Sequence, residues 1–139
     1  MLRKDYIIRL TEEFGKFIGI VFSLKNQDKW EELEKLINDS AKKFTNIEID
    51  FVESLPDENL PEKLFKEHGL NIENIKMLAD LLYEKGLNYS KLDEEIKSLN
   101  AYKKSMLLFR YVNDKSLDSD FSLDMHYKMK TLEQFLGLK

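Results

Sequence analysis

The stretch "LADLLYEKG", residues 78–86, has the pattern of an amphipathic helix that packs small residues against a neighbouring helix. Asn71 precedes it and is a favoured N-cap residue, while Gly86 is typical of the left-handed residue that ends a helix. The inward positions recur three and four residues apart; they are Ile72, Ile75, Leu78, Ala79 and Leu82. We therefore predict a helix from Asn71 to Gly86, whose packing partner lies elsewhere in the chain.

The segments before this stretch show the same periodicity. A first helix is expected from about Asp5 to Leu24, and a second helix follows a short turn, so the two should form an antiparallel hairpin. Residues 46–55, "NIEIDFVESL", alternate like a strand, but no second strand is available for pairing, and we interpret them as helical. Pro61 suits the first turn of a short helix that ends at His68 and Gly69. The apolar positions of the second helix are Trp30, Leu33, Ile37, Ala41 and Phe44.

Two further helices are expected after Gly86. Ser90 and Asp93 approximate a capping box before a long helix, and Gly137 should stop a last helix that runs from about Phe121 to Leu136. The apolar positions of the long helix are Leu92, Ile96, Leu99, Tyr102, Met106 and Phe109, and those of the last helix are Phe121, Met125, Met129, Leu132 and Leu136. The prediction is one all-α domain over residues 1–139, a helical bundle of about six to seven helices.

Composition supports this architecture and excludes several functions. The 139 residues include 42% hydrophobic residues, only 2 Pro and 5 Gly, and no Cys, which removes disulfides and thiolate metal sites. The net charge is −4 and the basic residues are dispersed, so nucleic-acid binding is not expected. Charged residues interrupt every apolar run, so no membrane span is predicted. We expect a cytoplasmic protein.

The first helix has more apolar surface than one neighbour needs. Its core stripe consists of Ile7, Leu10, Phe14, Phe17, Val21 and Leu24. Ile8 and Phe22 lie outside this stripe, and Gly15 and Gly19, four residues apart, open a flat surface on which another helix could approach closely. Ile8, Gly15, Gly19 and Phe22 are therefore the candidate face for a protein partner or a homo-oligomer.

Two resemblances follow from these patterns. The spacing of Ile75, Leu78, Ala79, Leu82, Tyr83 and Gly86 resembles the first helix of a tetratricopeptide repeat, and Tyr102 and Ser105 resemble the aromatic and small positions of the second helix. The connection between them is several residues longer than the repeat allows, and only one unit is visible. The whole chain also resembles a family of small uncharacterised bacterial helical proteins, through "DYIIR", "SLPDENLPEKLF" and "ENIKMLADLLYEKG". These resemblances imply tetratricopeptide-like helical hairpins and protein binding, without catalytic residues.

The chain offers little that points to catalysis. His68 and His126 are the only histidines, and His126 shares the polar face of its helix with Ser122, Lys130 and Glu133. Adjacent carboxylates such as Glu12 and Glu13 diverge by about 100° on a helix and cannot share a substrate. We predict no catalytic residue, cofactor or metal site.

One candidate motif is disfavoured, and one alternative function stays open. A calcium loop beginning at Asp118 is disfavoured, because Leu123 and Met129 occupy positions that require Gly and Glu. A small-molecule or metal site in a pocket near His126 and Tyr127 is the alternative function. The aromatic side chains Tyr6, Trp30, Tyr83, Tyr89, Tyr102, Tyr111 and Tyr127 are candidate interface anchors as a set.

Overall fold

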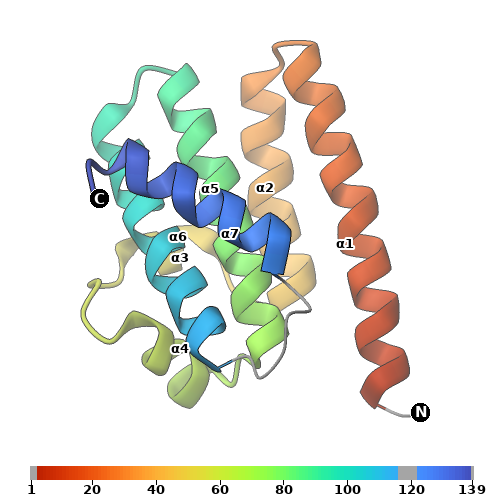
Figure 1. The fold of residues 1–139 in the computed structure, drawn as a ribbon. Coiled ribbons are helices and arrows are strands. Elements are labelled where there is room, and N and C mark those ends of the chain that lie inside the picture. The colour runs from red at the N-terminus through yellow and green to blue at the C-terminus, as the bar shows by residue number, and fades with distance from the viewer. Residues whose placement is uncertain (1–2, 116–121, 139) are drawn as a thin grey trace.

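The computed structural model describes residues 3–115 and 122–138. Within these ranges the chain forms seven helices and no strand, which confirms the all-α class (Figure 1). The helices are α1 (Arg3–Asn26), α2 (Trp30–Thr45), α3 (Ile49–Ser54), α4 (Leu60–His68), α5 (Ile72–Lys91), α6 (Glu95–Lys115) and α7 (Ser122–Phe135). None of the described helices is long and apolar enough to span a bilayer.

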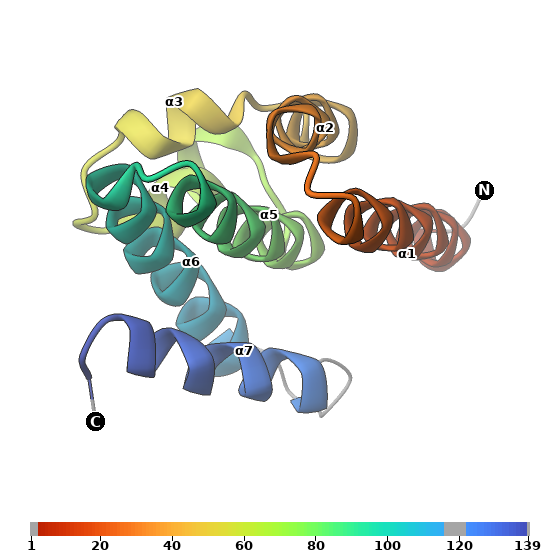
Figure 2. The same cartoon turned by 90° about the horizontal axis from the view of Figure 1, so that it is seen from above.

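Helix α5 lies at the centre of the bundle. It pairs most extensively with the antiparallel α6 and next with α2, while α7 crosses over the α5–α6 pair as a separate layer (Figures 1 and 2). Leu81 and Tyr83 point to nearly opposite sides of α5, and both are buried. A helix that is apolar on most sides belongs inside a protein, so α5 forms the axis on which the other helices pack.

Close contact between α5 and α6 depends on small residues and hydroxyl groups. Ser105 Oγ donates a hydrogen bond to the Ala79 carbonyl at 2.8 Å, and Ser98 Oγ donates one to the Gly86 carbonyl at the same distance. The Tyr102 ring lies directly against Gly86, where an added Cβ would come within 2.4 Å of two ring carbons. Gly86 therefore provides space for Tyr102. The prediction that it ends the helix is wrong, because α5 continues to Lys91.

The junction between α5 and α6 also corrects two other expectations. Ser90 is part of α5 and caps nothing, and α6 begins only at Glu95, after a short connection in which Asp93 has a φ of 61°. The predicted long connection is thus replaced by a tight turn between two long helices. Ile96 and Leu99, which we expected in the core, are 86% and 44% exposed, because α6 turns its serine and alanine side toward α5.

The remaining boundaries agree with the sequence patterns. Residues 49–54 are helical, Pro61 lies in the first turn of α4, and Gly69 follows α4 with a φ of 66°. Asn71 caps α5 in a reciprocal pair, in which its Oδ1 accepts from the Asn74 N–H at 2.8 Å. Gly137 follows α7 with a φ of 71°. Phe121 and Asp118 lie outside the described residues, as do the first four positions of the disfavoured calcium loop, whose remaining positions, 122–129, belong to helix α7.

Candidate interaction surface

Helix α1 lies at the edge of the molecule and packs mainly against α2 (Figures 1 and 2). Its predicted stripe faces the core, because Leu10, Phe14, Phe17 and Val21 are all at most 9% exposed. The Phe14 and Phe44 rings meet edge to face, with their centroids 5.3 Å apart. One side of α1 is thus fully used in fixing this helix on α2.

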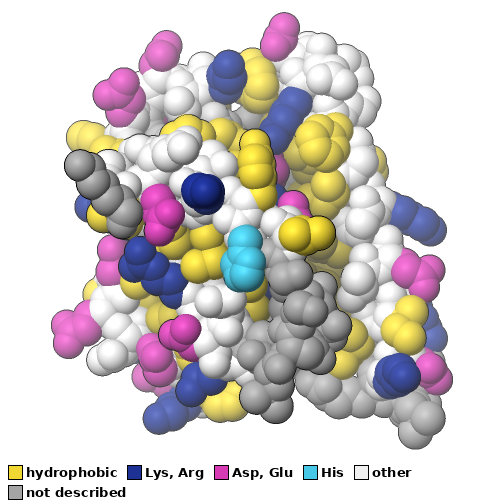
Figure 3. Space-filling view, in the orientation of Figure 1, with side chains coloured by type: hydrophobic (Ala, Val, Ile, Leu, Met, Phe, Trp, Pro, Cys, Tyr) yellow, Lys and Arg dark blue, Asp and Glu magenta, His cyan; other side chains and the backbone are white. Residues whose placement is uncertain are grey.

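The opposite side of α1 is open, and it carries the four residues of the candidate partner face. Ile8 is 47% exposed and Phe22 is 59% exposed. A Cβ added at Gly15 or at Gly19 would meet nothing within 4 Å. Hydrophobic side chains run along α1 in the space-filling view, between charged side chains at its outer edge (Figure 3). We call the surface formed by Ile8, Gly15, Gly19 and Phe22 the α1 face.

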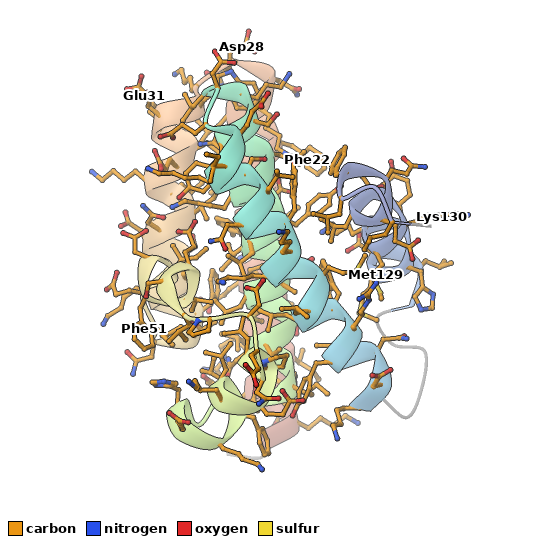
Figure 4. All side chains as sticks on the ribbon, turned by 90° about the vertical axis from the view of Figure 1, so that its left-hand side faces the viewer. Phe22, Asp28, Glu31, Phe51, Met129 and Lys130 are labelled. Carbon is orange, nitrogen blue, oxygen red and sulfur yellow. The ribbon has the colours of Figure 1, made fainter. Side chains whose placement is uncertain are left out.

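An ion pair lies next to the Phe22 end of this face. Lys25 Nζ lies 5.7 Å from the centroid of the Phe22 ring and pairs with the Glu84 carboxylate of α5, whose side chain is only 8% exposed. Phe22 itself projects from α1 on the side of the molecule where α7 lies (Figure 4). The cation and the ring favour each other, so the aromatic side chain is held at the surface instead of folding into the core.

A second charged cluster joins α5 to α7. Lys128 Nζ lies 2.9 Å from the Asp80 carboxylate and 3.3 Å from that of Asp124, and Lys76 binds the other Asp80 oxygen at 2.7 Å. Burial lowers the pKa of Lys128, but the Asp80 and Asp124 carboxylates outweigh that effect and leave the pKa above its ordinary value. Lys128 is therefore charged in this cluster, and its ion pairs hold α7 on the bundle.

On the other side of α5, Lys85 is almost fully buried. Its Nζ contacts the Asn38 side-chain oxygen and lies 3.8 Å from the carboxylates of both Asp50 and Glu53. Tyr89 donates a hydrogen bond to Glu53 at 2.8 Å. Burial raises the pKa of Glu53, although Lys85 and the Tyr89 hydroxyl oppose the change. This cluster joins α2, α3 and α5 through charge and hydrogen bonds.

A second buried lysine, Lys104 of α6, acts in the same way. Its Nζ lies 2.6 Å from the Asp57 carboxylate, in the connection between α3 and α4. Asn100 donates to the Glu53 carbonyl at 3.1 Å. The segment from Asp50 to Asp57 is thus fixed to α5 and α6 by two buried cations. Sequence reasoning missed both lysines, although the lack of a wholly polar side on α5 indicated that its charged residues had to be buried.

Both histidines lie at the surface of the molecule. His126 is exposed, and one of its ring nitrogens lies 3.1 Å from Asn113 Oδ1, while Tyr127 is 71% exposed. His68, also exposed, meets the Phe51 ring edge to face at 5.2 Å. No group of three or more metal-ligating residues comes together among the described residues. The prediction of a pocket at His126 thus gains no support from the geometry.

Three of the seven candidate aromatic anchors are buried in the core. Tyr83, Tyr89 and Tyr102 are at most 7% exposed and belong to the core. Trp30 and Tyr111 are half-buried against the core, which leaves Tyr6 and Tyr127 as the exposed members of the set. The interface hypothesis is therefore wrong for Tyr83, Tyr89 and Tyr102.

Two of the surface grooves on the described part of the chain lie between helices. A groove of about 310 Å³ lies between α1 and α2. It is lined by Glu13, Lys16, Phe17, Ile20, Leu36, Asp39, Ser40, Lys43 and Phe44. A groove of about 300 Å³ lies where α5 and α6 meet the end of α7, next to Tyr102 and Phe135, whose stacked rings are 4.9 Å apart. Both are open, and neither is lined by a histidine.

Comparison with known proteins assigns no relationship. No family model, no curated protein and no solved structure matches this chain. The resemblances to the tetratricopeptide repeat and to the family of small bacterial proteins therefore stay predictions.

Proposed function

We propose that this chain is a non-enzymatic interaction module, which binds another protein or a second copy of itself through the α1 face. The observation that carries the proposal is the open apolar side of α1, where Ile8 and Phe22 are about half exposed and the glycines between them have free space. Exposed apolar side chains that lie on one line along a helix, with open space between them, are a surface on which another helix can pack.

The chemistry of this face suits a helix as the docking element. Glycine lets two backbones approach closely, because no Cβ intervenes. Phe22 supplies a large apolar side chain of the kind that anchors interfaces, and it is orientated by Lys25. The α5–α6 hairpin, with small residues at its contact points, supports a tetratricopeptide-like arrangement beside this surface. We place such a module in the cytoplasm.

The absence of a catalytic role is part of the proposal. Three buried charged groups of α5 each pair with a side chain of opposite charge; they are Asp80, Glu84 and Lys85. Such pairing accounts for their presence as structural links between helices.

The test is affinity capture from an extract of the source cell with the wild-type chain and with Phe22→Glu. The change puts a charge on the α1 face, next to Lys25, and should abolish binding without unfolding the domain. Leu123→Glu is the matched control, because Leu123 is 87% exposed on α7 and lies off the α1 face. Circular dichroism checks that both variants fold.

The expected result is a protein, or the chain itself, retained by the wild type and by Leu123→Glu but lost with Phe22→Glu. Equal retention by all three chains, or no retention by the wild type, would remove the α1 face as a functional surface.

A further inference from the structure

We infer that the occupant of the α1 face is a second copy of this chain, with the two α1 helices antiparallel across a two-fold axis at Gly15. The inference rests on the proposed function and specifies its partner. It depends on the order of residues along the face, on the space measured at the glycines and on the charges at the edge of the face.

The apolar residues of the face are arranged symmetrically about Gly15. Ile8 precedes Gly15 by seven residues and Phe22 follows it by seven. Residues seven apart drift by only about 20° around a helix, so all three lie on one line along α1. In an antiparallel pair centred on Gly15, each Ile8 therefore faces the Phe22 of the second copy, and the two Gly15 residues face each other.

The space around the glycines fits this contact. Two helices that cross at glycine can bring their backbones together, and the Cβ position of Gly15 has no neighbour within 4 Å. Ile8 and Phe22 lie about 10 Å to either side of Gly15 along the axis. Each copy thus offers one close-contact point flanked by two apolar side chains of different size, which is a self-complementary surface of the kind that two-fold dimers use.

The charges at the edge of the face have the same complementarity. Glu12 and Lys16 are exposed on one edge of the α1 face. Across a two-fold axis, that edge meets the same edge of the second copy, and Glu12 comes opposite residue 18, about 3 Å along the axis from Lys16 of the other chain. Each Glu12 can therefore pair with a Lys16, twice per dimer. A parallel pair would instead bring this edge against the opposite edge of the second copy, so that Glu12 and Lys16 would not meet.

The size of the face indicates a modest affinity. Helix α1 has 24 residues and is therefore about 36 Å long. One helix per subunit is a small interface by the standards of stable dimers, so we expect association in the micromolar range and exchange between chains in solution.

Sedimentation equilibrium with mixed variants tests the inference. Ile8→Lys and Phe22→Glu, both at exposed positions, should each remain folded and each raise the dissociation constant at least about tenfold, because a charge meets an apolar side chain twice. An equimolar mixture should recover a dimer, because the introduced lysine then faces the introduced glutamate at one end and Ile8 faces Phe22 at the other. This heterodimer should weaken as salt is added.

The alternatives give different results. A parallel arrangement predicts no recovery in the mixture, since Ile8 would meet residue 8 and Phe22 would meet residue 22. A wild-type chain of 16.5 kDa at all concentrations up to about 300 µM would overturn the inference. A dimer that neither variant weakens would also overturn it. If the wild type stays monomeric and still captures a different protein that Phe22→Glu loses, the self-association fails while the proposed function stands.

Discussion

Two glycines that both lie inside helices have opposite surroundings. Gly86 in α5 is buried against the Tyr102 ring, whereas Gly19 in α1 faces open space. Glycine in a helix interior costs about 1 kcal/mol relative to alanine. Only at Gly86 is that cost offset by packing within the same chain.

The two sites therefore predict opposite effects of the same substitution. Gly86→Ala should lower the free energy of unfolding by about 1 to 2 kcal/mol. The new methyl group displaces the buried Tyr102 ring, and the free-energy cost of that displacement exceeds the gain in helix propensity. Gly19→Ala should raise it by about 0.5 to 1 kcal/mol. Urea denaturation of dilute samples measures both. A Gly86→Ala chain as stable as the wild type would show that Tyr102 does not need this space.

The sequence pattern could not distinguish these uses of glycine. A glycine that follows an apolar run is most simply interpreted as a helix terminus, and that interpretation succeeded at Gly69 and Gly137, which have a positive φ. It failed at Gly86, because the deciding contact comes from Tyr102, sixteen residues later. Capping at Asn71 was predictable because its partner, Asn74, lies only three residues away.

At the scale of elements, the short helix α3 and the connection after it are held by buried charge. α3 has only six residues, too few for stable helix formation on its own. Val52 is fully buried, and the Lys85 and Lys104 ion pairs fix both ends of the segment from Asp50 to Asp57. Residues of α5 and α6 thus supply what the local sequence lacks.

Removal of one buried lysine should loosen this segment. We expect Lys85→Met to lower the free energy of unfolding by about 3 kcal/mol, because Glu53 loses its cation in a largely buried site. Amide hydrogen exchange should speed up from Asp50 to Asp57. Lys97→Met is the control, since Lys97 is 63% exposed in its pair with Glu94 and should change stability by less than about 0.5 kcal/mol. If the two changes lowered the free energy of unfolding equally, the buried Lys85 cluster would contribute no more stability than an exposed ion pair.

Helix α6 marks the limit of periodicity as a guide to burial. Its apolar positions predicted a buried Ile96 and Leu99, but the close contact with α5 selected the serine and alanine side of the helix. Hydroxyl groups that bond a neighbouring backbone cannot be recognised from hydrophobicity alone. For α1 and α2, whose contact is made by large apolar side chains, the stripe and the burial agree.

At the scale of the whole molecule, the bundle is organised around α5, and α1 lies at its edge against α2 (Figure 2). The fold class was predictable because helical periodicity runs through nearly the whole chain. The α1 face was predictable as a second apolar side, and the structure leaves that side open. The ion clusters at Lys85 and Lys128 were not predictable, since the first joins α2, α3 and α5 and the second joins α5 to α7, which are far apart in the sequence.

The central claim is that the α1 face binds a second copy of this chain at Gly15. The most direct test is made on Gly15→Ala, with stability and self-association followed in the same samples. If Gly15 exists for contact with a second chain, the substitution should raise the free energy of unfolding of the monomer by about 0.5 to 1 kcal/mol. The dissociation constant in sedimentation equilibrium should rise at the same time, because two methyl groups meet at the axis. A monomer that gains stability while its association is unchanged would contradict the account.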